Sequence, residues 1–298
     1  MEIDVSEWIN LYNKYCHNYS SSENDRKFAS LTGTVPQVAE TIFLKYGNHI
    51  LLQNRTRLLI VLNFLKNSPT EDQGASLFEL SRTTYRKYLW DTLLYLDFIM
   101  DEVHMKDRFM PFVPENGLFE NVTLVVDATE CAIDRPTRRE DRNLYSNGRH
   151  KENTHGRYNL KYTVGVQVAT GKICFVSNPE PGSVADIQAL VNSDLVDYMT
   201  PGEIILADKG YQGHPNCLSP FKGTNLDATE EAFNEIIASV RQVVECVFSR
   251  MKIFGIIGKG RYRWDLSNHR AVFNVCAQIT NISLDRSPLW LETNFYMK

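Results

Sequence analysis

Two apolar, β-branched runs that each end in an aspartate are the feature that most restricts how this chain can fold. The run NVTLVVD ends at Asp127, and the run EIILAD ends at Asp208. Runs of this kind predict buried strands. A third acid, Glu245, lies in a long stretch whose apolar residues recur with helical period, which predicts an amphipathic helix. Buried strands combined with long helices predict an α/β layer fold.

The same three acids suggest a metal site. Carboxylates at two strand ends and on one helix can converge on a hard cation, because Mg²⁺ is held by a few carboxylate oxygens together with water and substrate phosphate. Such a site would suit phosphodiester cleavage. Each acid also has an ordinary alternative: Asp127 and Asp208 could cap turns after their strands, and Glu245 could form a surface pair with Arg241.

Helical and strand-like segments occupy different parts of the chain, which predicts a helical domain at residues 1–110 and an α/β domain at residues 111–298. The segment MPFVPENG, with two prolines and a glycine, is the expected linker. Strands are predicted at residues 122–127, 159–169, 172–177 and 203–208. Helices are predicted at residues 36–46, 53–66, 71–77, 81–103, 184–198, 229–254 and 268–282. Thr170 and Gly171 should form the tight turn of a hairpin between the second and third strands.

The charge distribution bears on the partner. A net charge of −4 disfavours nucleic acid, since phosphate binding depends on Lys and Arg. However, residues 241–270 hold seven Lys and Arg against two acids, and residues 134–161 hold eight against four. These segments could bind phosphates or could be solvated loops. The stretch GKGRYRW at residues 258–264 interleaves cations with aromatics, which suits phosphates and stacked bases, although an ordinary turn with a partly buried Trp264 fits equally well.

The helical domain contains a pattern typical of a helix-turn-helix. Its second helix would begin after the N-cap residue Ser81, which leaves Arg82 and Arg86 available for DNA. Residues 1–110 contain 12 Lys and Arg against 14 Asp and Glu, so strong DNA binding by this domain alone is not expected. A packing unit or protein-interaction surface is the alternative.

Other features place the chain among folded intracellular proteins. The hydrophobic fraction of 43% suits a well-buried core. Six scattered cysteines without a CxxC pair favour neither a disulfide framework nor a zinc finger. The amino terminus lacks the apolar core of a signal peptide, and the run at residues 58–65 is too short to span a bilayer. We therefore expect a soluble protein without a membrane partner.

Six short blocks follow one another along residues 120–283. They are Val126-Asp127-Ala128-Thr129 with Ile133, Arg135 and Pro136; Tyr145-Ser146 with Gly148 and Lys151; Leu160-Lys161; Pro181-Gly182-Ser183-Val184 with Asp186; Leu206-Ala207-Asp208-Lys209-Gly210-Tyr211 with Gly213; and Arg241 with Val244-Glu245, Phe248 and Lys252. In this order they resemble the DDE-superfamily transposases of the PIF/Harbinger and related bacterial insertion-sequence type. One departure is Ala185, which stands where family members often carry His.

The resemblance implies a ribonuclease-H-like mixed-sheet catalytic domain preceded by a small all-α, helix-turn-helix-like domain. It implies a DNA transposase that cuts transposon ends and joins them to target DNA. Asp127, Asp208 and Glu245 would be the catalytic triad that binds two Mg²⁺ or Mn²⁺ ions. Beside this triad, the cations expected to contact DNA are Lys209, Arg241, Lys252, Lys259, Arg261, Arg263, Arg82 and Arg86.

The expected partners are transposon-end and target DNA, further copies of the chain in a homo-oligomer, and a separate Myb-like DNA-binding protein of the kind that eukaryotic members use. The expected location is the nucleus in a eukaryote, or the cytoplasm and nucleoid in a bacterium. Two other functions stay open. One is a domesticated, catalytically silent adaptor that binds DNA or chromatin, and the other is a stand-alone metal-dependent nuclease.

Overall fold

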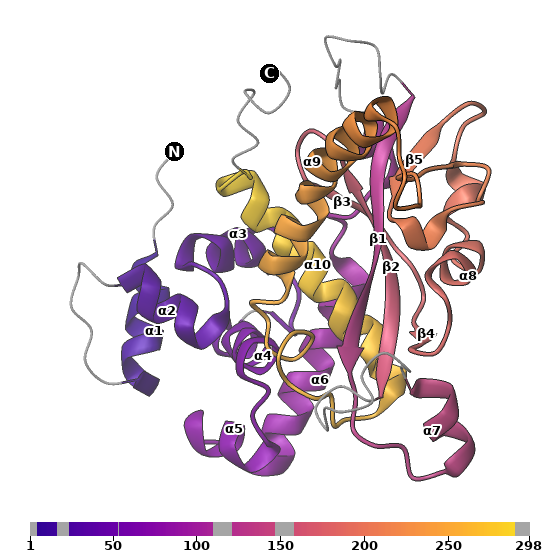
Figure 1. Ribbon diagram of the computed structural model, residues 1–298. Coiled ribbons are helices and arrows are strands. Elements are labelled where there is room, and N and C mark those ends of the chain that lie inside the picture. The colour runs from indigo at the N-terminus through magenta and orange to yellow at the C-terminus, as the bar shows by residue number, and fades with distance from the viewer. Residues whose placement is uncertain (1–4, 17–23, 53, 110–120, 147–157, 290–298) are drawn as a thin grey trace. The chain divides into compact units, whose positions relative to one another are not determined.

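The computed structural model describes residues 5–16, 24–52, 54–109, 121–146 and 158–289 of the chain. The chain forms two compact units (Figure 1): Met1–Glu102 with Met251–Arg286, and Val103–Arg250 with Ser287–Lys298. The predicted division near residue 110 lies close to the first crossing between the units. However, the chain returns to the first unit at Met251, so neither unit is one continuous segment. The predicted linker at residues 110–117 lies outside the described residues.

The first unit is built from helices. They are α1 (Ser6–Cys16), α2 (Asn24–Thr32), α3 (Pro36–Tyr46), α4 (Arg55–Asn67), α5 (Glu71–Leu77), α6 (Arg82–Ile99) and α10 (His269–Arg286), with the short 3₁₀-helix η6 (Leu266–Asn268) before α10. Helix α4 packs against α2 and α6, and α10 packs against α3 and α6. Among the described helices of the chain, none is both long enough and apolar enough to cross a membrane.

The burial of α10 explains why the C-terminal segment belongs to the helical unit. Side chains such as Ala271, Val272 and Phe273 are buried on different sides of this helix. A helix that is apolar around most of its circumference must be enclosed by other elements. Helices α3 and α6 provide that cover, which corrects the expectation that residues 268–282 belong to the α/β domain.

Capping residues set the starts of several helices in the first unit. The side chain of Asn54 caps α4, and Ser81 caps α6. Thr70 and Gln73 form a capping box at the start of α5. The predicted helices at residues 36–46 and 71–77 are confirmed, whereas α1 and α2 were not predicted. Helices α5 and α6 therefore exist, but their predicted role as a DNA-binding helix-turn-helix stays a prediction.

The second unit contains a mixed sheet. Its strands are β1 (Val122–Ala132), β2 (Asn159–Gln167), β3 (Ile173–Val176), β4 (Glu180–Pro181), β5 (Ile204–Ala207) and β6 (Cys217–Leu218). Their order is β3-β2-β1-β5-β6, and β4 pairs with β2. Strand β5 is parallel to β1 and β6, while the pairs on the other side of β1 are antiparallel. This mixed sheet is consistent with the expected ribonuclease-H-like α/β class.

Helices and turns complete the second unit. They are η2 (Met105–Phe109), α7 (Arg139–Tyr145), α8 (Asp186–Val191), η4 (Leu195–Tyr198), η5 (Lys209–Tyr211) and most of α9 (Ala228–Met251). The single helix predicted at residues 184–198 is instead α8 followed by η4, because Asp194 adopts a left-handed conformation with φ of 58° between them. The predicted hairpin joins β2 to β3, and Gly171 takes the positive φ of 74° that its turn requires.

Strand β1 is longer than predicted. Its parallel pairing with β5 ends at Val126 and Ala207, but its antiparallel pairing with β2 continues to Ala132. Asp127 therefore does not end the strand. It marks the position at which β1 loses one of its two neighbours.

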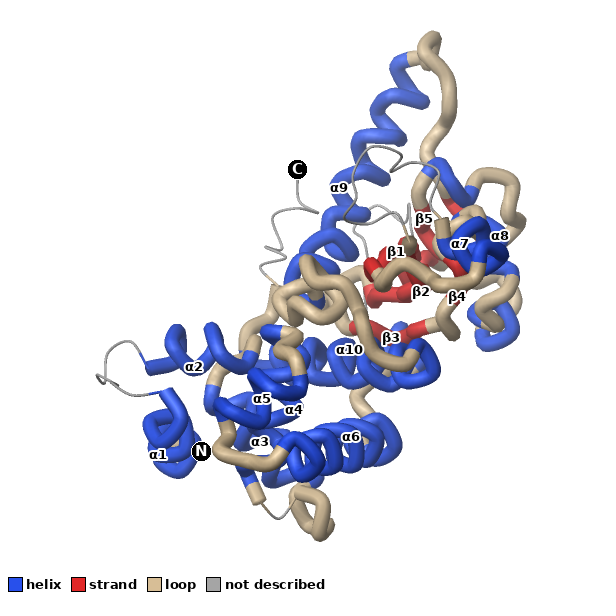
Figure 2. The backbone as a smooth tube through the Cα atoms, turned by 90° about the horizontal axis from the view of Figure 1, so that it is seen from below, coloured by secondary structure: helices blue, strands red, loops and turns tan. Residues whose placement is uncertain are grey.

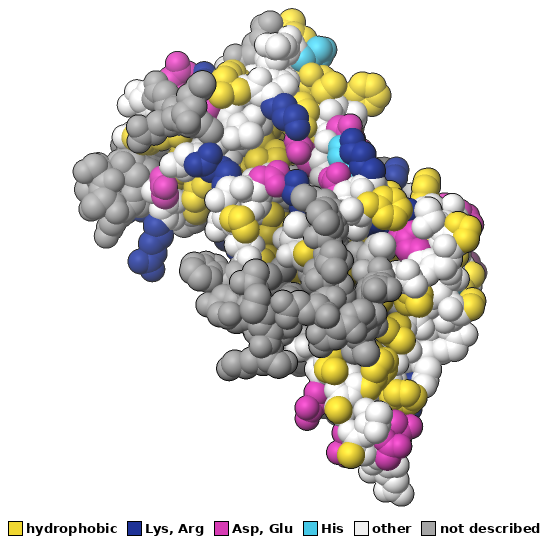
Figure 3. All heavy atoms as spheres, turned by 90° about the horizontal axis from the view of Figure 1, so that it is seen from above, with side chains coloured by type: hydrophobic (Ala, Val, Ile, Leu, Met, Phe, Trp, Pro, Cys, Tyr) yellow, Lys and Arg dark blue, Asp and Glu magenta, His cyan; other side chains and the backbone are white. Residues whose placement is uncertain are grey.

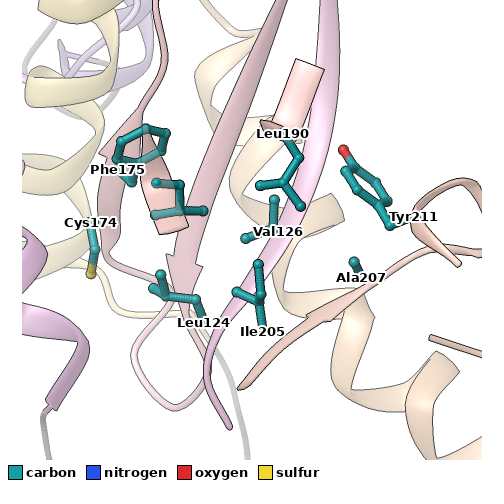
Figure 4. Close-up of a cluster of buried hydrophobic side chains, with 9 residues drawn as sticks. Leu124, Val126, Cys174, Phe175, Leu190, Ile205, Ala207 and Tyr211 are labelled. Atoms are coloured by element: carbon teal, nitrogen blue, oxygen red, sulfur yellow. The ribbon is translucent and has the colours of Figure 1, made fainter. Parts of the chain in front are cut away.

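One face of the sheet packs against α8 and η4. Its core consists of Leu124, Val126, Cys174, Phe175, Leu190, Leu195, Ile205, Ala207 and Tyr211 (Figure 4). Successive side chains of a strand point to opposite faces, so Val125 and Asp127 point away from this core. Helix α9 lies on that other side of β1, across from α8, in both backbone views (Figure 1, Figure 2).

Candidate active site

Asp127 and Asp208 lie side by side. They directly follow the last parallel pair, Val126 and Ala207, and neighbouring strands are about 5 Å apart. The Asp127 side chain is 19% exposed and the Asp208 side chain 48%. The sheet therefore brings together two carboxylates, one largely buried and one half open to solvent.

Arg241 of helix α9 reaches both aspartates. Its Nη1 donates a hydrogen bond of 3.2 Å to Oδ1 of Asp208, and its Nη2 lies 3.8 Å from Oδ2 of Asp127. Helix α9 begins after Asp227, whose side chain accepts hydrogen bonds from the backbone N–H of Thr229 and Glu230. The helix then buries one apolar stripe. Arg241 lies at the edge of that stripe and is 18% exposed.

Backbone N–H groups orient the two carboxylates. Oδ1 of Asp127 accepts a 2.8 Å hydrogen bond from the N–H of Ala128, and Oδ1 of Asp208 accepts a 2.6 Å hydrogen bond from the N–H of Lys209. Asp208 thereby caps η5, so the capping alternative holds locally. An ionised carboxylate has about four acceptor positions, and capping is therefore compatible with binding a cation.

The electrostatics show an excess of negative charge. Burial raises the pKa of Asp127 to about 6; its backbone hydrogen bond and Arg241 oppose this rise, while Glu245 and Asp208 add to it. Glu245 is exposed on α9, one turn after Arg241. The negative charge of Glu245 thus acts on Asp127 through space, from a neighbouring position on helix α9.

The predicted triad stays a prediction. Within the described residues, no group of three or more His, Cys, Asp or Glu side chains is arranged to hold a metal. Asp127 and Asp208 are neighbours that both face Arg241, and Glu245 is exposed on α9. The side chains of Asp127 and Asp208 nevertheless fit a hard divalent cation, because such ions bind carboxylate oxygens. The single guanidinium of Arg241 also leaves part of their negative charge uncompensated. Asp127 and Asp208 would hold such an ion, with Glu245 completing its ligands.

A second ionic cluster, on the α8 side of the sheet, was not predicted. Lys161 of β2, with a side chain only 6% exposed, donates 2.6 Å and 2.7 Å hydrogen bonds to the carbonyl of Val184 and to Oδ1 of Asp186. Its Nζ lies 4.0 Å from Oε1 of Glu130. A Cβ added to Gly210 would lie 3.2 Å from Oδ2 of Asp186. Lys161 therefore anchors the start of α8 to β2, and Asp186 lies close to the turn that follows Asp208. Lys161 and Asp186 both belong to the six blocks of the family resemblance, but the blocks did not indicate that the two residues pair.

The aromatic residues of the loop after α9 pack as they would in an ordinary turn. Tyr262 is buried and donates a hydrogen bond to the carbonyl of Asp265. Trp264 packs edge-on against Phe64, with the ring centroids 4.6 Å apart. Arg263 lies over the Trp264 ring at 5.4 Å. Tyr262 is therefore not available to stack on bases, and the nucleic-acid interpretation of the rest of this stretch stays a prediction.

The cations predicted to bind DNA are in varied settings. Lys209, Lys252, Lys259 and Arg263 are exposed, and Arg261 is half-buried. On the face shown in Figure 3, basic side chains lie singly or in small groups next to acidic ones. Several residues of the basic segment at residues 134–161, among them Gly148 and Lys151, lie outside the described residues. A DNA-binding role for any of these residues stays a prediction.

Arg82 and Arg86 are exposed, but both also pair with an acid of helix α5. The Nε atoms of Arg82 and Arg86 donate hydrogen bonds of 2.8 Å and 2.6 Å to Glu71 of helix α5. Hydrogen bonds from Arg86 and then Arg82 lower the pKa of Glu71 to about 2, against the opposing effect of burial. Glu71, together with Asp72 at 3.7 Å from Arg82, therefore offsets much of the charge that was expected to face DNA.

Comparison with known proteins agrees with the arrangement around Asp127 and Asp208. Residues 126–281, more than half of the 298-residue chain, match the family described as DDE superfamily endonuclease. The match starts next to Asp127 and includes most of helix α10, which packs in the first unit. No curated protein and no solved structure matches the chain. With more than half of its length matched, this chain belongs to the DDE superfamily endonucleases.

Proposed function

We propose that this protein is a metal-dependent DNA transposase that cuts transposon ends and joins them to target DNA, of the PIF/Harbinger or related bacterial insertion-sequence type. The observation that carries the proposal is the adjacent pair Asp127 and Asp208, in a chain that belongs to an endonuclease family. The partners are DNA and further copies of this chain, with a Myb-like protein and a nuclear location in a eukaryotic host, or a cytoplasmic and nucleoid location in a bacterium.

The residues of the site have distinct tasks in this proposal. Two bound Mg²⁺ or Mn²⁺ ions would activate the attacking oxygen and stabilise the leaving oxygen of a phosphodiester. Asp127, Asp208 and Glu245 would hold them, and the N–H groups of Ala128 and Lys209 keep the two aspartates oriented. The half-exposed Asp208 leaves the site open to a large substrate. The exposed Lys209 lies next to it and would bind a phosphate.

Cleavage of DNA that carries the matching inverted repeats tests the proposal. The purified protein should cut these ends with Mg²⁺ or Mn²⁺, and Asp127→Asn, Asp208→Asn and Glu245→Gln should each lower the rate by at least about 10³-fold. Glu235→Gln, at an exposed acid of the same helix, is the matched control and should cut normally. Circular dichroism and thermal melting should show that each variant is folded.

The products separate the proposed activity from the two alternatives. A transposase yields both cut ends and strands joined to target DNA, whereas a stand-alone nuclease yields cut ends alone. Binding of the ends without any metal-dependent cutting would identify a silent adaptor. Normal cutting by one of the three acid variants would remove that residue from the catalytic set.

A further inference from the structure

Two arginines of the second unit contact carboxylates in very different ways. Arg108, whose side chain is 5% exposed, donates hydrogen bonds of 2.6 Å and 3.2 Å to the two oxygens of Glu203. It also donates to the carbonyls of Met105 and Tyr198. A guanidinium whose donors are occupied in this way is a permanent structural clamp.

Arg241 is held much less completely. Its single hydrogen bond among the described residues is the 3.2 Å contact to Asp208, and the 3.8 Å separation from Asp127 is too long for another. Its Nε is buried and has no hydrogen-bond partner within the described part of the chain. A buried donor without a partner costs free energy. Charge, rather than a network of hydrogen bonds, therefore keeps this guanidinium in place.

The surrounding charges are unbalanced. Arg241 faces Asp127 and Asp208 directly, and Glu245 lies one helical turn away on α9. These groups carry three negative charges against one positive charge when all are ionised. A divalent cation would balance more of this charge than one guanidinium, and it could approach both aspartates more closely.

We propose that Arg241 is a placeholder cation: it holds Asp127 and Asp208 together in the metal-free protein, and a divalent ion displaces it on binding. The inference rests on the proposed function, because it assumes that the two aspartates are metal ligands. Displacement releases a guanidinium with a planar set of donors, which suits a phosphate group. As the metal binds, Arg241 would thus leave the protein carboxylate and contact the DNA backbone instead.

Calorimetric titration with Mn²⁺ alone tests the displacement. Full-length wild type, Arg241→Gln and Arg250→Gln are titrated at mildly alkaline pH, so that Asp127 is ionised in each. Arg241→Gln should bind Mn²⁺ about tenfold more tightly than wild type, because no charge-assisted hydrogen bond has to be broken first. Arg250→Gln is the matched control, since this arginine lies on the same helix but contacts the carbonyls of Ser287 and Pro288, and it should bind like wild type.

Thermal melting gives a second readout that does not depend on activity. Without metal, Arg241→Gln should melt at a lower temperature than wild type, because the two aspartates lose their counter-charge. With saturating Mn²⁺ most of this difference should disappear, since Arg241 no longer contacts the aspartates in either protein. Arg241→Lys keeps the positive charge but has one nitrogen atom rather than two with which to contact the aspartates. Its Mn²⁺ affinity should fall between the affinities of wild type and Arg241→Gln.

The outcomes distinguish this inference from the proposed function. If wild type binds Mn²⁺ and Arg241→Gln binds it equally or less tightly, Arg241 supports the metal site and the displacement is refuted. If neither protein binds Mn²⁺, the metal site itself is refuted, and the proposed function is refuted with it. If Arg241→Gln does not fold, Arg241→Lys provides the test, and affinity no higher than that of wild type would refute the displacement.

Discussion

The protein contains two clusters in which arginines and acids meet in different proportions. On α5 and α6, Arg82 and Arg86 both pair with Glu71, whose pKa falls to about 2, and Arg82 also lies 3.7 Å from Asp72. In the other unit, Arg241 is shared by Asp127 and Asp208, and the pKa of Asp127 rises to about 6, chiefly through burial. The first cluster stabilises its ionised acid, whereas the second leaves its acid short of positive charge.

This contrast indicates that the balance of charges, rather than their presence, separates the two regions. Sequence alone suggested that Arg82 and Arg86 were free to bind DNA, yet these cations already have an acid to pair with. Asp127 and Asp208 have one cation between them, and that cation makes few contacts. A region whose charges are balanced internally serves structure, and a region with an uncompensated charge is suited to binding a ligand.

The cluster around Lys161 offers the strongest test of this distinction, because it also has one cation for two acids but is fully packed. Lys161→Met should destabilise the protein by about 3 kcal/mol, since Asp186 would stay largely buried without its partner. Urea denaturation measures this change, with Lys222→Met at an exposed lysine of the same unit as control. A loss of stability no larger than that of the control would mean that Lys161 does not anchor α8.

Asp127→Asn should stabilise the metal-free protein at neutral pH by about 2 kcal/mol, because it removes a buried charge. The folded-state pKa of about 6 exceeds the ordinary value of 3.8. Folding therefore favours the protonated acid, and wild-type stability falls as the pH rises through this interval. The advantage of the variant should vanish once the pH is below the ordinary pKa. Denaturation curves at neutral and acidic pH measure it, and a variant that is less stable at both would contradict the charge imbalance.

Glu71→Gln should release Arg82 and Arg86 and so strengthen DNA binding by the full-length protein at low salt by about tenfold, with a salt dependence steeper by about one to two units. The depressed pKa of Glu71 means that its stabilising effect is present above the ordinary pKa of 4.5 and is lost as the pH falls toward 2. The variant should therefore also be slightly less stable at neutral pH. Fluorescence anisotropy measures the binding.

The double variant Arg82→Ala with Arg86→Ala provides the comparison for that measurement. It should lose the binding that Glu71→Gln gains. If both proteins bind DNA like wild type, the helix-turn-helix proposal fails for α6, and the first unit is better explained as a surface for protein contacts.

The smallest effect is expected in the loop after α9. Neutralising Lys259, Arg261 and Arg263 should reduce the salt slope of DNA binding by about one unit for each phosphate that the loop no longer binds. Tyr262→Phe should leave DNA binding unchanged, because Tyr262 is buried. Titrations at several salt concentrations measure both, and an unchanged slope would favour a solvated loop that binds no phosphate.

Sequence predicted those elements of the fold that their own residues determine. Helices α3 and α5 and the β2–β3 hairpin follow from local periodicity, capping residues and a turn glycine. The extension of β1 past Asp127 could not be predicted, because pairing with β2 is what makes that segment a strand. The assignment of α10 to the helical unit likewise depends on its contacts with α3 and α6.

The candidate site was predictable to the same limited degree. The apolar runs before Asp127 and Asp208 predicted that each acid follows a buried strand, but only the parallel pairing of β1 with β5 shows that the two acids are neighbours. Helical spacing placed Arg241 and Glu245 on one side of α9, but spacing does not tell which side chain faces the sheet. Arg241 turned toward the aspartates, which only the packing of α9 could reveal.

Binding of a divalent metal by Asp127 and Asp208 underlies both the proposed activity and the proposed displacement of Arg241. An anomalous difference map from crystals of the wild-type protein soaked in Mn²⁺ would detect such an ion in place. We predict a strong peak between the two carboxylates, with the guanidinium of Arg241 moved away from both and the peak absent from Asp208→Asn crystals. A well-resolved map with no peak there, and with Arg241 still between the aspartates, would show that the pair is not a metal site.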